Sequence, residues 1–169
     1  MAKITLITGS GKGKTSTSMG HIYLERFRGK RIIVAQFLKT GKDCGECYFL
    51  KRFDSLKWFT FGKDEFLVSE KQIEEFRQIV REGIDEVFEE INKNKTDVLL
   101  LDELGTALFY NLLTWENLQP LLEKVEEEII ITGREIPQIF KGKFDEMIEI
   151  KEIKHPFNNG ILARKGIDY

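Results

Sequence analysis

Short, mainly apolar segments alternate along the chain with longer segments in which apolar residues recur every three or four positions. The apolar segments predict strands at 4–8, 31–37, 56–61, 98–101, 129–132 and 147–150. Residues 14–28 and 69–91 are predicted to be helices, and helices are also expected at 106–113 and after Thr114, whereas 39–55 is predicted to be irregular. Strands that alternate with helices predict an α/β fold with a mostly parallel sheet and helices on both faces.

The composition is that of one folded domain spanning residues 1–169, with 154–169 expected to form an ordered C-terminal tail. Hydrophobic residues make up 41% and charged residues 32%, which excludes a disordered or fibrous chain. The net charge of −2 gives no general basic surface for nucleic acid, and no apolar run approaches the ~20 residues of a membrane span. A strand pattern at the N-terminus and only two cysteines lead us to expect a cytoplasmic protein without a membrane or nucleic-acid partner.

A glycine- and lysine-rich segment, T-G-S-G-K-G-K-T-S at 8–16, lies between the first strand and the first helix. Glycines let the backbone turn sharply and aim N–H groups at phosphate oxygens, and the helix adds the positive end of its dipole. Lys14 can reach phosphate as a point charge, and the Thr15 hydroxyl suits Mg²⁺ or Mn²⁺. Thr8 stands where the general P-loop pattern has its first glycine, which indicates a variant loop. We expect nucleotide contacts from Gly9, Ser10, Gly11, Lys12, Gly13, Lys14, Thr15 and Ser16, within a P-loop NTPase architecture of the RecA-like type.

Two carboxylates, Asp102 and Glu103, directly follow the buried strand at 98–101. Ligands of parallel sheets bind beyond the carboxyl ends of the strands, so these side chains should face the phosphate loop. We expect Thr15, Asp102 and Glu103 to form the metal site, with Glu103 acting either on the metal or on the substrate. Arg134 follows the strand at 129–132 and should reach the same crevice, where it would contact a phosphate, a ribose or a carboxylate of a second substrate.

Several segments together resemble the P-loop type of ATP:corrinoid adenosyltransferase. G-S-G-K-G-K-T at 9–15, A-Q-F-L-K at 35–39 followed by Gly45-Glu46, L-L-L-D-E-L at 99–104 and I-I-I-T-G-R at 129–134 are similar to that family's motifs in order and spacing. The segment at 153–169, I-K-H-P-F-N-N-G-I-L-A-R-K-G-I-D-Y, resembles the family's C-terminal sequence and is its most specific feature. The likeness covers nearly the whole chain.

The resemblance implies a reaction in which a Co(I) corrinoid attacks the 5′ carbon of ATP and triphosphate leaves. It implies ATP as co-substrate, catalytic roles for Lys14 and Glu103, an electron-donating reductase and a homodimer. The family also places aromatics after a glycine in the middle segment, where this chain has Gly62-Lys-Asp-Glu-Phe66, and an arginine in the first helix where this chain has Leu24. We therefore expect Phe61, Phe66 and Arg26 on the corrinoid side.

Two other functions remain open at this stage. A different P-loop ATPase or a small-molecule kinase would act at the γ-phosphate, and a regulatory nucleotide-binding module would bind ATP without turnover. The pair Cys44 and Cys47 lacks the further ligands that a zinc site requires, and Trp58 and Trp115 are interpreted as packing residues.

Overall fold

A six-stranded sheet forms the centre of the molecule in the computed structural model, which describes residues 1–42, 45–50, 52, 56–64 and 70–154. The strands are β1 (Lys3–Thr8), β2 (Ile32–Phe37), β3 (Lys57–Phe61), β4 (Val98–Asp102), β5 (Glu128–Thr132) and β6 (Glu146–Glu149). They are ordered β3-β2-β4-β5-β1-β6, and every neighbouring pair is parallel. The predicted α/β fold with a mostly parallel sheet is confirmed. The tail predicted at 154–169 lies, apart from its first residue, outside the described residues.

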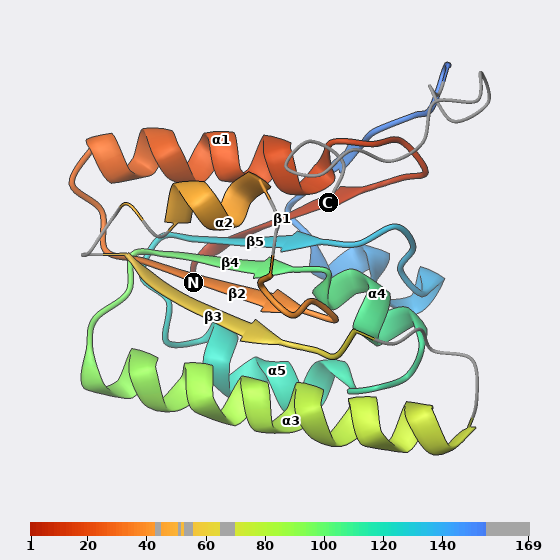
Figure 1. The fold of residues 1–169 in the computed structure, drawn as a ribbon. Coiled ribbons are helices and arrows are strands. Elements are labelled where there is room, and N and C mark those ends of the chain that lie inside the picture. Colours follow the sequence, from red (N-terminus) through yellow and green to blue (C-terminus); the bar gives the residue numbers. More distant parts are fainter. Residues whose placement is uncertain (43–44, 51, 53–55, 65–69, 155–169) are drawn as a thin grey trace.

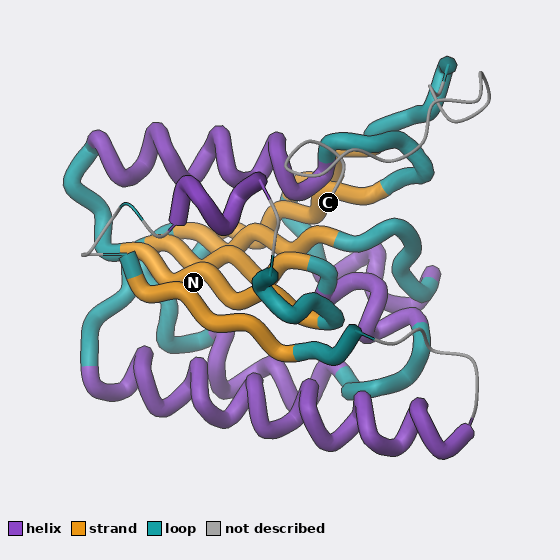
Figure 2. The backbone as a smooth tube through the Cα atoms, in the orientation of Figure 1, coloured by secondary structure: helices purple, strands orange, loops and turns teal. Residues whose placement is uncertain are grey.

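Helices cover both faces of this sheet, as predicted. They are α1 (Lys14–Phe27), α2 (Gly45–Leu50), α3 (Glu70–Lys93), α4 (Leu104–Phe109), α5 (Trp115–Leu122) and a 3₁₀ segment at Gln138–Lys143. Figure 1 shows α1 and α2 on one face, α3 and α5 on the other, and α4 beside the strand ends, and the tube in Figure 2 shows the same layers.

Two helical predictions were wrong in detail. The segment predicted to be irregular contains α2, which at six residues is too short to give a periodic pattern. The helix predicted at 106–113 is α4, which starts at Leu104 and ends at Phe109. Asn111 adopts a left-handed conformation with φ 53°, which ends the helical path, and asparagine tolerates this conformation better than most residues.

The apolar strands divide their side chains between two cores, one on each face of the sheet. In β4, Leu99 and Leu101 pack on the side of α3 and α5, whereas Val98 and Leu100 pack on the side of α1. This alternation follows from the period of two in a strand. The continuous apolar run of β4 is therefore explained by burial on both faces, which is typical of a central parallel strand.

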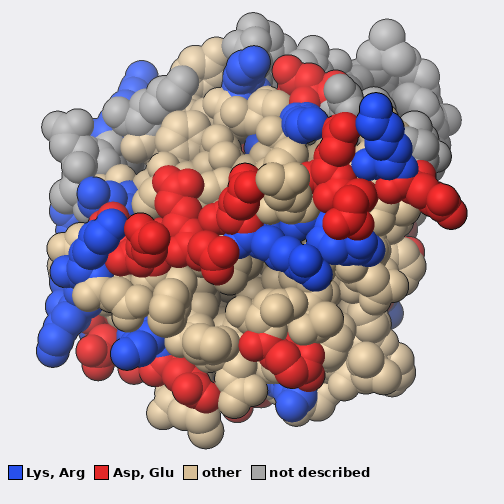
Figure 3. All heavy atoms as spheres, turned by 90° about the horizontal axis from the view of Figure 1, so that it is seen from below, with Lys and Arg blue, Asp and Glu red and all other residues tan. Residues whose placement is uncertain are grey.

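The longest helix, α3, turns its predicted apolar stripe toward the larger core. Phe76, Val80, Ile84, Val87 and Ile91 are buried there. Its solvent side carries charges of both signs, which form the mixed band of acidic and basic side chains seen from below in Figure 3. None of the helices in the described ranges is both long enough and apolar enough to cross a membrane.

The strand register brings the carboxyl ends of four strands to one edge of the sheet. Gln36 of β2 is paired with Asp102 of β4, and Ile7 of β1 is paired with Thr132 of β5. Because the phosphate loop starts where β1 ends, the loop and Asp102 lie on the same edge with β5 between their strands. Ligands of open parallel sheets bind at such an edge.

Candidate nucleotide and metal site

The glycine-rich loop has the backbone conformation that its sequence predicts. Gly9 has φ 109° and Gly13, the residue that caps α1, has φ 110°, and both values are unfavourable for other residues. The loop is also braced from outside, because the Gly11 N–H donates to the carbonyl of Ile150 at 2.8 Å. A side chain at Gly11 would meet that carbonyl oxygen at 2.7 Å, so glycine is required there for close packing.

Lys14 is buried at the start of α1 and bends back over the loop. Its ammonium donates to the carbonyls of Gly9 and Gly11, both at 2.8 Å. Burial lowers the pKa of Lys14 below its ordinary value, an effect that Glu103 opposes and Arg134 increases through its positive charge. Arg134, which follows the carboxyl end of β5, lines a pocket beside the loop together with Gly9.

Asp102 is completely buried at the end of β4 and accepts hydrogen bonds on both carboxylate oxygens. Thr132 donates to its Oδ1 at 2.6 Å, and the Thr15 hydroxyl lies 3.1 Å from the same atom. Gln36 donates to its Oδ2 at 3.0 Å, and the Lys39 ammonium donates to that oxygen at 2.7 Å. Burial alone would raise the pKa of Asp102, but the Lys39 charge and these hydrogen bonds hold the pKa below its ordinary value. The carboxylate is thus kept ionised beside the loop.

A second layer of side chains orients the groups that contact Asp102. The Trp58 ring N–H donates to the Gln36 carbonyl oxygen at 2.9 Å, which fixes the amide so that its NH₂ faces Asp102. Lys39 also donates to Glu46 on α2 at 3.3 Å. Burial would lower the pKa of Lys39, but the Asp102 carboxylate outweighs this effect and raises the pKa above its ordinary value.

Asp102 was predicted from the sequence, whereas Lys39 and Thr132 were given no such role and Trp58 was interpreted as a packing residue. The signal that could have found Lys39 and Thr132 is their place at strand ends, since Thr132 is the last residue of β5 and Lys39 lies two residues after β2. Trp58 carries no such signal, because only the register of β3 against β2 places its ring beside Gln36.

Glu103 lies beside this cluster but its carboxylate turns toward its own helix. It adopts a left-handed backbone conformation with φ 61°, which is strained for a residue with a side chain. Its backbone N–H donates to the Thr132 hydroxyl at 2.9 Å, and its carboxylate accepts from Thr106 at 2.7 Å. The Thr106 hydroxyl accepts in turn from the backbone N–H of Arg134 at 3.2 Å, so β5 and α4 are held together at the site.

The donor set suits a hard divalent cation that also binds a nucleotide. Thr15 and Asp102 offer hydroxyl and carboxylate oxygens, which Mg²⁺ prefers, and Mg²⁺ typically takes few protein ligands and completes its shell with phosphates and water. No cluster of three acidic, histidine or cysteine side chains suited to a metal occurs in the described part of the chain.

Phe61 and Arg26, two of the residues expected on the corrinoid side, do not join this cluster. Phe61 stacks on Phe59 and packs over Gly83 of α3, on the sheet face opposite α1. Arg26 lies twelve residues after Lys14 along α1, about 18 Å at the rise of a helix. Phe66 falls outside the described residues, as does Cys44.

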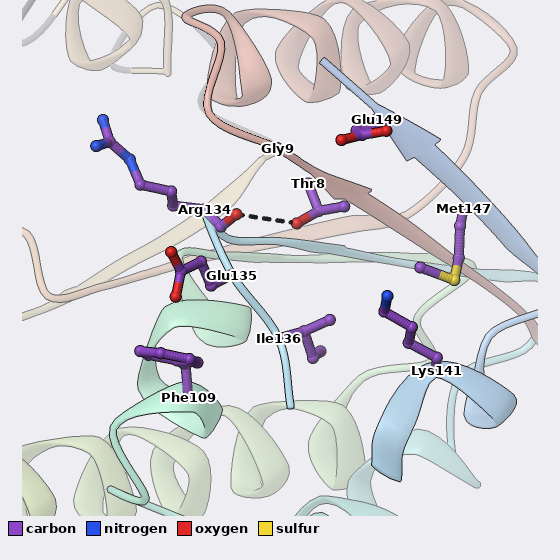
Figure 4. A pocket seen from close by; sticks show the side chains of 9 residues that line it. All are labelled: Thr8, Gly9, Phe109, Arg134, Glu135, Ile136, Lys141, Met147 and Glu149. Carbon is purple, nitrogen blue, oxygen red and sulfur yellow. Dashed lines mark hydrogen bonds between the residues drawn. The ribbon is translucent and has the colours of Figure 1, made fainter. Parts of the chain in front are cut away.

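A pocket of about 550 Å³ adjoins the loop on the side of β6. It is lined by Thr8, Gly9, Phe109, Arg134, Glu135, Ile136, Lys141, Met147 and Glu149, which Figure 4 shows arriving from the ends of β1, α4, β5 and β6 and from the 3₁₀ segment. The hydrogen bond from Thr8 to the Arg134 carbonyl, 3.2 Å long, closes its wall beside the loop. The volume is within the range of small-molecule sites.

A phosphate loop after β1, an ionised aspartate after β4 and a parallel sheet between two helical layers define a P-loop nucleotide-binding protein. Comparison with known proteins identifies the family within this class of nucleotide-binding proteins. The family model of the ATP:corrinoid adenosyltransferases BtuR/CobO/CobP matches residues 2–169. The chain belongs to this family and is therefore a transferase.

Relatives of the chain carry the corresponding name. A corrinoid adenosyltransferase of Escherichia coli (strain K12) is 30% identical over 168 residues, which cover 98% of this chain and 85% of the relative. A corrinoid adenosyltransferase of a Sinorhizobium species is 25% identical over 98% of this chain and 79% of its own length. The protein named corrinoid adenosyltransferase CobA of Salmonella typhimurium is 27% identical over 98% of this chain and 85% of its own length.

Proposed function

We propose that this protein transfers the 5′-deoxyadenosyl group of ATP to the Co(I) of a corrinoid and releases inorganic triphosphate. The cobalt supplies the electron pair for the new Co–C5′ bond, and the bond between C5′ and the α-phosphate oxygen breaks with its electron pair going to triphosphate. Cobalt thereby becomes Co(III). The observation that carries the proposal is the cluster of Lys14, Thr15 and ionised Asp102 at the phosphate loop of a chain that belongs to this family.

The residues of the loop would act on the leaving group. The first turn of α1 leaves N–H groups outside the helical hydrogen-bond ladder, and these face the loop where triphosphate would bind. Lys14 would exchange one of its bonds to the Gly9 or Gly11 carbonyl for a phosphate oxygen. Because these groups are already in place, they would stabilise the negative charge that grows on triphosphate without reorganising. Arg134 would add a second positive charge at the far side of the loop.

Thr15 and Asp102 would hold Mg²⁺ against the triphosphate. When bound, the metal supplies positive charge that neutralises the leaving group. Thr15 would keep its O–H directed at Asp102 and offer an oxygen lone pair to the metal, which fits the hydrogen bond between the two residues. Glu103 would reach the metal only through water or after leaving Thr106.

The chemistry of the proposed reaction requires no general base, since Co(I) carries no proton to remove. In a hydrolase or a kinase, by contrast, a side chain must orient or deprotonate the nucleophile. The Glu103 carboxylate accepts a hydrogen bond from Thr106 and is held on its own helix, an arrangement that suits adenosyl transfer. Positioning C5′ against cobalt would supply much of the remaining acceleration.

The partners follow from the same proposal. The corrinoid must arrive reduced, so an electron-donating reductase is expected, and a homodimer in the cytoplasm is the assembly that the family resemblance implies. Phe66, together with Phe61 and Arg26, stays our prediction for the corrinoid side.

The test is anaerobic. The protein is mixed with MgATP and chemically reduced Co(I) cobalamin, the absorbance change of Co–C bond formation is followed, and the phosphate products are separated by ion-exchange chromatography. We expect adenosylcobalamin and intact triphosphate in equal amounts. ADP with orthophosphate, and no change in the corrinoid spectrum, would instead support a γ-phosphate ATPase or kinase.

A further inference from the structure

The ammonium of Lys39 lies between the two protein oxygens that the metal would use. Its Nζ is 3.1 Å from the Thr15 hydroxyl oxygen and 2.7 Å from Asp102 Oδ2. Its third hydrogen-bond partner is the Glu46 carboxylate at 3.3 Å. A lysine ammonium has three N–H donors, so these three acceptors satisfy it completely.

The backbone around Lys39 is built to hold it there. Leu38, which precedes it, has φ 57°, a left-handed conformation that is unfavourable for a bulky residue. The Leu38 N–H is bound to the Phe61 carbonyl at 2.7 Å. Gly62 packs so closely that a side chain there would meet the Lys39 backbone nitrogen at 2.3 Å. A strained turn held by a neighbouring strand end is the kind of feature that persists at functional sites.

The hydrogen bonds at Thr15 show why ammonium and metal compete. Thr15 donates its single proton to Asp102 and accepts from Lys39 through oxygen. A metal bound to Thr15 would need that oxygen and would lie beside the same Asp102 carboxylate, at a separation from the ammonium where two positive charges repel strongly. Both cations therefore cannot hold this position together.

We propose that the Lys39 ammonium is a tethered cation that holds Asp102 and the Thr15 hydroxyl in position before substrate binds. A divalent metal then enters only by displacing this ammonium. Triphosphate provides the means, because its negative charge both attracts the metal and offers the displaced ammonium a new partner. Free Mg²⁺ would thus bind poorly, and metal and nucleotide would enter together. This inference rests on the metal role proposed for Asp102 and names the residue that controls metal entry.

The test measures binding of Mn²⁺ by electron paramagnetic resonance, with and without inorganic tripolyphosphate, and needs no turnover. Lys39→Met should bind Mn²⁺ alone at least about tenfold more tightly than the unaltered protein. The matched control is Lys42→Met, three residues along the same loop, where the lysine is 75% exposed and pairs only loosely with Asp64 at 3.8 Å. It should leave Mn²⁺ affinity unchanged.

The substitution Lys39→Met leaves the buried Asp102 carboxylate without its cation, so a second variant is needed in case this one does not fold. Gly62→Ala keeps the lysine but should displace its backbone from the strand end, and it too should tighten Mn²⁺ binding. Equal or weaker Mn²⁺ affinity in every folded variant overturns the competition. The variant Asp102→Asn shows whether only the Lys39 competition is wrong or whether the proposed metal site itself is wrong. If Asp102→Asn binds Mn²⁺ with tripolyphosphate as the unaltered protein does, the metal role of Asp102 is wrong and the inference is lost with it.

Discussion

The hydroxyl of Thr132 is the best single point at which to test whether the Asp102 network holds the fold together. It is completely buried, donates to Asp102 at 2.6 Å and accepts from the Glu103 N–H at 2.9 Å. Thr132→Val preserves the shape of the side chain and removes both bonds. A hydrogen bond to a charged group contributes about 1.5–3 kcal/mol, and an unsatisfied buried N–H costs about 1–3 kcal/mol. Since Thr15 still donates to Asp102, we expect a loss of about 2–4 kcal/mol in the free energy of unfolding.

The assay is urea unfolding followed by circular dichroism, with the midpoint and the slope fitted separately. For a chain of this size the expected loss corresponds to a fall of about 6–12 °C in Tm. Thr5→Val is the matched control, because Thr5 is also a buried strand threonine but its hydroxyl makes only 3.5 Å contacts with Glu128 and Glu146. It should change stability by less than about 1 kcal/mol. Equal stabilities of the two variants would refute the view that Thr132 supports the site.

Three further changes test other parts of the structure. Lys14→Ala should lower the rate of adenosyl transfer at least about 100-fold while leaving the circular dichroism spectrum unchanged; a near-normal rate would contradict its role on the leaving group. Gly83→Ala should lower Tm although alanine favours helices, because its Cβ would lie 2.6 Å from the Phe61 ring; a raised Tm would mean that the ring moves aside without cost. Arg31 holds the pKa of Asp97 at about 2, below its ordinary 3.8. The stability that the ionised Asp97 carboxylate contributes is therefore complete above pH 3.8 and is lost as the pH falls to about 2. Asp97→Asn should therefore be less stable than the unaltered protein at neutral pH and nearly equal to it near pH 2 in urea unfolding curves, and a constant difference would exclude this linkage.

The strands and the phosphate loop were predictable because their causes are local. An apolar run of three or four residues that is buried on both faces predicts a central parallel strand, and β4 and β5 follow this rule. Gly9 and Gly13 stand where the backbone takes positive φ, so the residue type itself indicates the turn. The position of Asp102 at this edge of the sheet was predictable as well, since Asp102 directly ends a buried strand.

The groups around Asp102 were not predictable in the same way, because non-local contacts place them. Lys39 comes after a leucine in a left-handed conformation, and nothing in the residue type of Leu38 announces that turn. The turn exists because the Phe61 carbonyl and the bare backbone of Gly62 hold it from the next strand. Likewise, Trp58 orients Gln36 only through the register of β3 against β2. Sequence patterns indicate which residues are buried, but they do not indicate which polar side chains form hydrogen bonds with one another.

The charges brought together in this way explain how the site is stabilised without substrate, and they lead us to expect a rearrangement of Lys39 when substrate binds. The cations named at the site, Lys14, Lys39 and Arg134, equal in number the carboxylates of Asp102, Glu103 and Glu46, so these named groups balance in formal charge. A buried carboxylate without a partner would be costly, and the tethered ammonium of Lys39 removes that cost without any metal. Triphosphate brings several negative charges to this balanced site, and a divalent cation restores the balance only if Lys39 moves from Asp102 toward the phosphates. The same balance that stabilises the folded chain would therefore make metal entry depend on the nucleotide.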